Sequence, residues 1–417
     1  MTFYQKIKKI FFPFYKSKDI KNLFSILEKN KSKNTQVAMF VGGCVRKFLQ
    51  NETIDDIDIA TIFSPETIKE KFQNTNFKII DTGVEHGSIT IIVNSSKFEI
   101  TTLRQDIKTD GRHAEVSFTD SWSRDSERRD FTINAIYMDI RGKLYDPQNG
   151  KEDLKNNKVN FIGSPSARIE EDYLRIIRYL RFCVQYNIKH SDPKIINAIK
   201  LNLNGIKNLS KERVLRELYK IFKLKNIDIL LENVEIKNIF LLIFPEFKYL
   251  ERLKKCIFFE NPDLIFLILL IDKKNNYEYF CHKYKISNNL KKNLAFIANN
   301  YLKFKNEKNF LKKDLKKNIY NNGKENIKML IKFIYCAETK VSAKLLNNLL
   351  NLVDKMEIPS FPFNGKYLKD QGFTEGKEIG YILRALEKEW LNKDFNLNTN
   401  EAVSIVNKVK KSSVLNV

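Results

Sequence analysis

The sequence predicts an α+β protein in which an N-terminal part with strands and helices is followed by a long, purely helical remainder. A short apolar strand over residues 36–41 runs through a glycine pair into a short helix. Residues 97–104 alternate apolar and polar side chains, as a half-buried strand does. From about residue 225 to 350 the chain is rich in Lys, Asn, Leu, Ile and Phe at helical spacing, with few helix breakers.

The length of 417 residues exceeds one ordinary core, so several domains are expected. We expect a head over residues 1–155, a helical neck over 156–225, a helical body over 226–355 and a helical tail over 356–417. Whether residues 1–18 are ordered is left open. The net charge of +23 favours a polyanionic partner such as a nucleic acid.

Arginine is concentrated in one half of this lysine-rich chain. Of 15 arginines, 13 lie between Arg46 and Arg216. Most cationic residues of this chain are lysines. The positions that are arginine instead indicate sites that need a planar, bidentate donor for phosphate or base edges. The chemistry is therefore expected in the N-terminal half.

The five cysteines are scattered without C-x-x-C spacing, which argues against a zinc site and a disulfide framework and fits a reducing cytoplasm. The longest apolar run, over residues 264–271, is far shorter than the ~20 residues that cross a bilayer. We expect a buried helix there and no membrane partner.

The chain is organised around residues 41–61. Gly42 and Gly43 separate the first strand from a helix over residues 44–50. Such a glycine pair lets backbone N–H groups approach a polyphosphate at the positive end of the helix. Arg46, one turn into the helix, is a charged second donor for the same phosphates.

A second strand is predicted over residues 54–61, and it carries the D-x-D pair Asp56 and Asp58. Side chains alternate along a strand, so both carboxylates point the same way. They repel each other unless a cation lies between them, and hard oxygen ligands suit Mg²⁺. A phosphate site beside a metal-binding carboxylate pair is the minimum needed to transfer a nucleotidyl group.

This stretch resembles the nucleotidyltransferase head of the DNA polymerase β superfamily. It is more similar to the class II, bacterial-type CCA-adding tRNA nucleotidyltransferases and their poly(A) polymerase relatives, whose pattern is GG-x-V-R-D followed by D-x-D-[IL]-A-T. Lys47 stands where that pattern has Asp. The resemblance implies a polymerase-β-like head, a mixed sheet with flanking helices, ahead of an all-α neck, body and tail.

Other elements of the head follow in order. A helix is expected over residues 19–30, and Ser64 and Pro65 begin another as its cap and first residue. Residues 81–93 and 97–104 are predicted to pair as strands around a turn at 94–96. Glu99 then lies either on the metal face as a third carboxylate or in solvent, and the sequence does not decide between these.

Residues 105–123 are polar and without clear period, and they read as a long loop containing an Asp110-Gly111 turn. His113 is expected to contact substrate or merely to be exposed. In the family that the chain resembles, the loop at this position is flexible and helps the site change its preference between bases.

The motif RRDFTINA follows, over residues 128–135. Two adjacent arginines and an aspartate at a short helical turn suit a triphosphate and a ribose. The resemblance implies that Arg128, Asp130 and Asn134 contribute to nucleotide binding.

A helix is predicted over residues 167–185, with Asp172 and Arg175 as neighbours on one face. They could form a plain ion pair beside Arg178 and Arg181. Alternatively, a carboxylate beside a guanidinium complements the amine donor and ring-nitrogen acceptor that cytosine and adenine share, and rejects uracil and guanine. The run E-D-x-L-R-x-x-R-x-x-R-F resembles the class II signature, which implies base reading by Asp172 and Arg175, with Arg178 and Arg181 beside them.

Two further segments carry the resemblance. Residues 209–218 read LSKERVLREL, with Ser210 as a helix cap and Glu212 in the first turn. Residues 361–397 are similar to the family's tail, including a G-x-x-IG turn from Gly376 to Gly380 before an amphipathic helix. The lysine-rich helices either grip the acceptor and T arms of tRNA or are solvated charged faces.

The function that follows is the template-free addition or repair of the terminal CCA of tRNA from CTP and ATP, with Mg²⁺ and with release of pyrophosphate. Three alternatives stay open: a poly(A) polymerase, a split CC- or A-adding enzyme, and a non-catalytic RNA-binding protein. The sequence does not give the oligomeric state.

Overall fold

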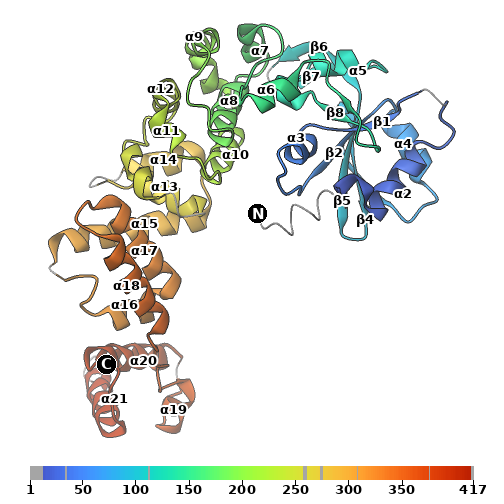
Figure 1. The fold of residues 1–417 in the computed structure, drawn as a ribbon. Helices are drawn as coiled ribbons and strands as arrows, with labels where there is room; N and C mark the ends of the chain where they lie inside the picture. Colours follow the sequence, from blue (N-terminus) through green and yellow to red (C-terminus); the bar gives the residue numbers. More distant parts are fainter. Residues whose placement is uncertain are drawn as a thin grey trace. The chain divides into compact units, whose positions relative to one another are not determined.

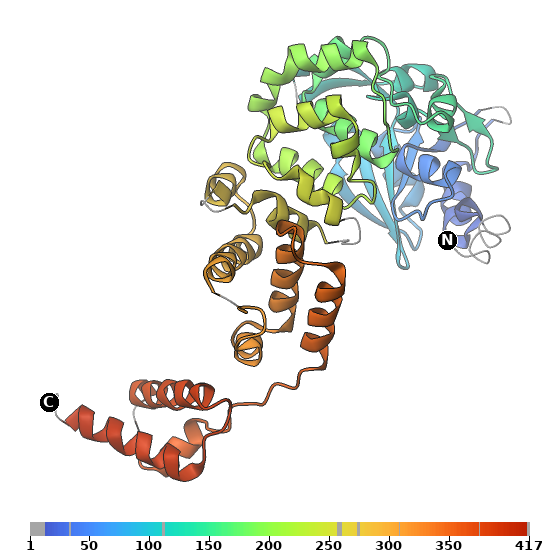
Figure 2. The same ribbon diagram turned by 60° about the vertical axis from the view of Figure 1, so that its left-hand side comes forward.

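The protein is described by a computed structural model over residues 13–32, 35–110, 113–256, 261–272, 276–307, 309–374 and 376–414 (Figures 1 and 2). The chain divides into two compact units. The first comprises residues 1–265 and 280–285, and the second comprises residues 266–279 and 286–417.

The first unit contains a seven-stranded sheet with the order β3-β4-β5-β2-β1-β8-β9. Strands β2 and β5 pair in parallel, whereas the other neighbours pair antiparallel, so the predicted mixed sheet is confirmed. The strands are β1 (Ala38–Val41), β2 (Ile57–Thr61), β3 (Lys78–Gly83), β4 (Ser88–Val93), β5 (Ser96–Thr102), β8 (Tyr137–Met138) and β9 (Leu144–Tyr145).

Helices flank this sheet, with α3 on one side of it and α2 and α4 on the other (Figure 1). Ser64 caps α4 by accepting from the Thr67 amide, and Pro65 is its first residue, as predicted. The helical elements of this part are η1 (Phe14–Lys16), α2 (Lys18–Leu27), α3 (Gly43–Leu49), α4 (Pro65–Phe72), η2 (Val84–His86), α5 (Trp122–Glu127), η3 (Thr132–Asn134) and α6 (Gly150–Lys155). Residues 13–18 are thus ordered, and residues 1–12 lie outside the described part.

Two strand predictions need correction. The second strand begins at Ile57 rather than at residue 54, so Asp56 lies just before it. Residues 81–93 are not one strand, because η2 separates β3 from β4. The predicted hairpin around residues 94–96 is confirmed, with Val93 opposite Ser96.

The prediction of a long loop over residues 105–123 is wrong. Strands β6 (Arg104–Asp110) and β7 (His113–Phe118) form a separate two-stranded sheet. Gly111 of the predicted turn lies outside the described part, as does the side chain of His113. The base of this hairpin packs on Gly87, the residue between η2 and β4, where an added Cβ would lie 2.8 Å from the Phe118 ring.

The prediction of one helix over residues 167–185 is also wrong. Helix α7 (Pro165–Glu171) ends before Asp172, whose backbone is extended, and α8 (Leu174–Gln185) begins two residues later. The Tyr173 ring lies against the backbone of Gly205, where an added Cβ would be 2.1 Å from the ring. This contact with a later segment stabilises the break.

The rest of the first unit is helical, and Ser210 caps α10 as predicted, with Glu212 in the first turn. Its elements include α9 (Pro193–Asn202), η4 (Leu203–Asn208), α10 (Lys211–Phe222), α11 (Ile229–Glu232), α12 (Val234–Ile243) and η5 (Leu250–Lys255). Helices α13 (Pro262–Leu270) and α14 (Asn276–Tyr284) cross the boundary between the two units. The predicted buried helix at residues 264–271 is confirmed by α13.

The second unit is purely helical in its described residues. Helices α17 and α18 pack side by side, as do α20 and α21 (Figure 2). Gly376 and Gly380 lie in the first turns of α20 and do not form a turn before it, which corrects the prediction. The helices are α15 (Asn288–Asn306), α16 (Leu315–Asn322), α17 (Lys324–Ala337), α18 (Ala343–Lys355), α19 (Gly365–Asp370), α20 (Gly376–Asn392) and α21 (Thr399–Val414).

The five cysteines are free and buried. Within the described ranges, none of the helices combines the length and apolar character that crossing a membrane requires.

Candidate active site

The glycine pair forms a gap between the end of β1 and the start of α3. Gly42 has φ +70°, a backbone conformation that residues with a Cβ rarely adopt. A Cβ at either Gly42 or Gly43 would lie 3.8 Å from Oδ2 of Asp58. The absence of both side chains therefore leaves room for a ligand directly beside this carboxylate.

The parallel pairing of β2 with β5 places Asp58 opposite Glu99. In register, these two residues lie on the same face of the sheet, while their neighbours Phe98 and Ile100 are buried on the other. Burial and repulsion from Glu99 raise the pKa of Asp58 to about 6, Asp56 adds to this rise, and Arg129 opposes it. Of the two positions left open for Glu99, the structure favours the carboxylate face, although the side chain itself is exposed.

These carboxylates have the chemistry of a metal site. Neither the Asp56 nor the Asp58 side chain makes a hydrogen bond or ion pair with the described part of the chain, and their oxygens are ligands that hard divalent ions prefer. Within the described ranges, no group of three or more His, Cys, Asp or Glu side chains is close enough to hold a metal, so Glu99 does not complete a cluster here.

A chain of buried polar contacts connects α3 to α8. Arg46 donates from Nη1 to Asn134 and from Nε to the Tyr186 hydroxyl, 2.9 Å away. Asn134 in turn donates to Asp130, at 2.6 Å, and Asp130 forms an ion pair of 2.8 Å with Arg178. Arg46 is 9% exposed, so the structure places it in the wall of the site rather than in open solvent.

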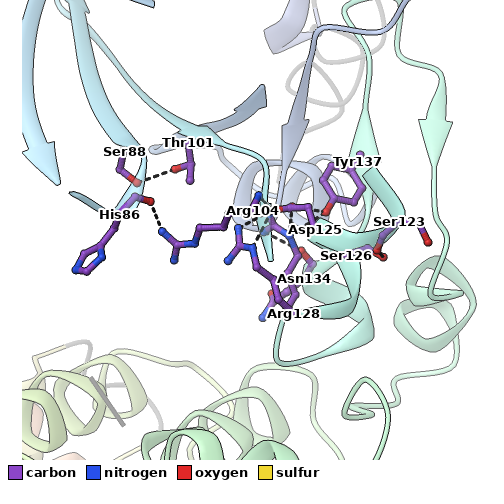
Figure 3. Close-up of polar contacts among 11 residues, drawn as sticks. His86, Ser88, Thr101, Arg104, Ser123, Asp125, Ser126, Arg128, Asn134 and Tyr137 are labelled. Atoms are coloured by element: carbon purple, nitrogen blue, oxygen red, sulfur yellow. Dashed lines mark hydrogen bonds and ion pairs between the residues drawn. The ribbon is translucent and has the colours of Figure 1, made fainter. Parts of the chain in front are cut away.

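Asp125 is buried and contacts both arginines at the start of the RRDFTINA motif (Figure 3). Its carboxylate accepts from Arg128, at 2.8 Å, and from Arg129, at 3.0 Å. It also accepts from the Tyr137 hydroxyl, at 2.6 Å, and from the backbone N–H of Arg104. Burial alone would raise the pKa of Asp125, but Arg129 and Arg128 lower it well below its usual range. Because Arg104 is the first residue of β6, the same carboxylate ties the hairpin to the arginines.

Asp172 and Arg175 do not pair with each other. Asp172 accepts from Arg213 of α10, at 2.7 Å, and from the Leu174 amide, at 3.1 Å. Arg175 forms an ion pair with Glu171 and donates to the carbonyl of Arg168. The simple ion pair that the sequence allowed for these two residues is therefore absent from the described structure.

Arg181, predicted to lie beside this pair, contacts α10 and the Phe182 ring. It donates from Nε to the buried Glu217 of α10, at 2.7 Å, and its guanidinium lies over the Phe182 ring. This contact joins α8 to α10.

Asp125 and Arg213 were not identified from the sequence, and Arg129 was identified only as one of the two adjacent arginines of RRDFTINA. Asp125 precedes Arg128 and Arg129 by three and four residues, a spacing that predicts contact on one helix face. That signal was available. The pairing of Arg213 with Asp172 had no local signal, because the two residues are 41 positions apart.

Family models and curated relatives both match this chain over long stretches. A family model described as the poly A polymerase head domain matches residues 38–160. A second, described as a probable RNA and SrmB-binding site of polymerase A, matches residues 191–250. The chain is 35% identical to CCA tRNA nucleotidyltransferase 1, mitochondrial, of Danio rerio, covering 93% of this chain and 92% of that protein. It is 34% identical to the CCA-adding enzyme of Staphylococcus saprophyticus over 74% of this chain and 76% of that enzyme.

Solved structures show the same fold at lower identity. The crystal structure of the Bacillus stearothermophilus CCA-adding enzyme in complex with CTP has a TM-score of 0.70 and 22% identity, covering 96% of this chain and 100% of that one. The Thermotoga maritima CCA-adding enzyme complexed with tRNA(CCA) has a TM-score of 0.63 and 20% identity, covering 95% of this chain and 96% of that one.

Replacing Asp58 with Asn should stabilise the metal-free protein, because it removes a carboxylate whose ionised form burial and Glu99 disfavour. In EDTA at about pH 8 we expect the Tm to rise by about 2–4 °C, the shift that ~1 kcal/mol gives a domain of this size. Thermal unfolding followed by circular dichroism measures it.

The rise in Tm of the Asp58→Asn variant should increase with pH. The pKa of Asp58 is raised from 3.8 to about 6, so the native protein loses stability as the pH rises through that window, and the advantage of the Asn variant grows over the same window. Asp81→Asn, at an exposed carboxylate, is the control. A Tm at pH 8 equal to or below that of the unchanged protein would contradict this reading.

Proposed function

Because this chain belongs to the family of CCA tRNA nucleotidyltransferases and CCA-adding enzymes, we propose that it adds or repairs the terminal CCA of tRNA. It is a nucleotidyltransferase that takes CTP and ATP as substrates, uses no nucleic-acid template and releases pyrophosphate. The single observation that carries the proposal is the carboxylate pair beside the glycine gap, in a chain similar to these enzymes over nearly its whole length.

Asp56 and Asp58 would hold a divalent ion, which we take to be Mg²⁺ because the donors are carboxylate oxygens. When bound, such an ion activates the 3′-hydroxyl of the RNA and neutralises charge on the leaving pyrophosphate. Glu99, paired with Asp58 across the strands, adds negative charge to the same face and supports binding of the ion. Gly42 and Gly43 leave the space that the triphosphate needs beside it.

The arginines next to this face suit the triphosphate and the ribose. Asp125 holds Arg128 and Arg129 in fixed directions, so their N–H groups need no reordering when a nucleotide arrives. Asp130 is held by Asn134 and Arg178 and offers an acceptor for ribose hydroxyls. Arg46, buried against Asn134 and Tyr186, supports this wall of the site.

Asp172 and Arg175 would read the base. The break between α7 and α8 frees the Asp172 carboxylate from the helix surface, and Arg213 fixes its direction. A carboxylate acceptor beside a guanidinium donor complements cytosine and adenine, whereas uracil and guanine offer a carbonyl beside an N–H. For this reading the Arg175 guanidinium must turn from Glu171 toward the base.

The helical neck, body and tail would hold the tRNA, and we retain the boundaries proposed from the sequence. The net charge of +23 and the lysine-rich helices support binding to the RNA backbone, the recognition that A-form RNA allows. The free cysteines suit a reducing compartment, which we take to be the cytoplasm.

The test is an extension assay on tRNA that ends just before the CCA. CTP alone should add the two cytidines and stop, ATP alone should add little, and the mixture should add CCA and stop. Product length on a sequencing gel is the measurement, and UTP and GTP should not be incorporated because the base site rejects them.

Each other result identifies a different protein. A long adenosine ladder means a poly(A) polymerase, and addition that stops partway with both nucleotides means a split CC- or A-adding enzyme. No extension, with tRNA still bound, means an RNA-binding protein without activity.

Replacing Asp56 with Ala should abolish addition, with a fall in rate of at least about a thousandfold, because the ion loses a ligand. Binding of tRNA, measured by filter retention at fixed salt, should stay within about twofold of the unchanged enzyme, since the phosphate contacts of the helical region are untouched. Retained addition would refute the metal assignment.

Replacing Arg213 with Ala should weaken base selection, because the Asp172 carboxylate loses the partner that fixes its direction. We expect the preference for CTP over UTP, as a ratio of kcat/KM, to fall about tenfold, within the range that one bidentate base contact supports. Arg216→Ala, at an exposed arginine on the same helix, is the matched control. An unchanged ratio in the Arg213 variant would remove Arg213 from the base-reading group.

A further inference from the structure

Lys47 forms an ion pair that joins two parts of the site. It lies in the last turn of α3, the helix that follows the glycine gap, and its Nζ donates to the carboxylate of Asp55. The Lys47 side chain is 29% exposed and the Asp55 side chain 67%. Asp55 is the residue before Asp56, so the pair links the glycine side of the site to the segment that delivers the acidic side chains.

That segment is not held by the main sheet. Strand β2 begins at Ile57, where its pairing with β5 also begins, and its pairing with β1 begins at Ile59. The chain leaves α3 through backbone hydrogen bonds from Gln50 to Arg46, at 3.0 Å, and from Glu52 to Lys47, at 2.8 Å. Asp56 therefore lies beyond the sheet pairing, and its direction depends on contacts of the connecting segment.

We propose that Lys47 is a positioning residue for nucleotide addition: it holds Asp55 against α3 so that Asp56, and not Asp55, accompanies Asp58 on the metal-binding face. The inference rests on the metal role proposed for Asp56 and Asp58. Adjacent residues of an extended chain point to opposite sides, so a rotation of this segment would exchange the two carboxylates. The lysine also neutralises one of three acidic side chains within four residues.

This reading explains why Lys47 departs from the pattern that the chain otherwise follows. An aspartate at position 47 would repel Asp55 instead of holding it. The lysine is therefore matched to this chain's own Asp55.

The test compares the single variants Lys47→Ala, Lys47→Asp, Asp55→Ala and Asp56→Ala with the double variants Lys47→Ala/Asp55→Ala and Lys47→Asp/Asp55→Lys. The matched control is Lys69→Ala, which breaks an exposed Lys–Asp pair of 2.8 Å with Asp81 elsewhere in the head. Three readouts are followed: kcat/KM for CTP addition, Mn²⁺ binding to the metal-free protein by electron paramagnetic resonance, and Tm.

Lys47→Ala should lower kcat/KM for CTP about three- to fivefold, the size that an exposed ion pair supports. Mn²⁺ alone should bind tighter by a similar factor, because the released Asp55 adds a carboxylate beside the ion. A purely structural role would not move these two quantities in opposite directions. Lys47→Asp should lower kcat/KM further, although it restores the usual residue of the family.

The decisive measurement is whether the double variants recover the kcat/KM that the single Lys47 variants lose. Both double variants should return kcat/KM to within about twofold of the unchanged enzyme, since the harm comes from an unpaired Asp55. The inference is overturned if Lys47→Ala behaves like Lys69→Ala, or if its defect adds to that of Asp55→Ala in the double variant. If Asp56→Ala keeps activity, the metal assignment fails; if Asp56→Ala is inactive and Lys47→Ala is unaffected, only the role of Lys47 fails.

Discussion

The parallel pairing of β2 with β5 is the constraint on which the rest of the site depends. It is the single parallel pair among the described strands, and it sets Asp58 beside Glu99. Burial, together with repulsion from Glu99, raises the pKa of Asp58 and so disfavours its ionised form. The space without side chains at Gly42 and Gly43 lies next to this repulsion. In the function proposed above, binding of a cation and a polyphosphate there would offset the repulsion.

Around this acidic face, buried carboxylates hold arginines in place. Asp125 holds Arg128 and Arg129, and Asp130 holds Arg178. A buried ion pair contributes little net stability, but loss of one partner costs about 3–5 kcal/mol because a charge is left unpaired. The main effect of these pairs is therefore to fix the direction in which the arginine side chains point. Asp125 also joins the hairpin at Arg104 to the same network.

Many elements of the fold and of the candidate site could be predicted from the sequence, because they depend on local signals. The glycine pair, the alternation around Glu99, and the caps at Ser64 and Ser210 each depend on a few adjacent residues. The hairpin over residues 104–118 and the break at Asp172 could not be read in this way. Phe118 packs on Gly87 and Tyr173 on Gly205, contacts between segments about 30 residues apart that no local period reveals.

The same distinction applies to the site. The residue types at Asp56, Asp58 and Asp172 were visible, but their partners were not. Arg213 lies 41 residues beyond Asp172, and the buried chain from Arg46 through Asn134 to Asp130 joins two segments that are 88 residues apart. A local sequence pattern predicts the candidate reactive residues. It does not predict their hydrogen-bond and ion-pair partners, because these come from distant parts of the chain.

The contact between Tyr173 and Gly205 has an evolutionary consequence. With the ring 2.1 Å from the place of a Cβ, no other residue fits at position 205 while an aromatic ring occupies position 173. The two positions are therefore expected to change together: a lineage that loses the glycine must first replace the tyrosine with a small side chain.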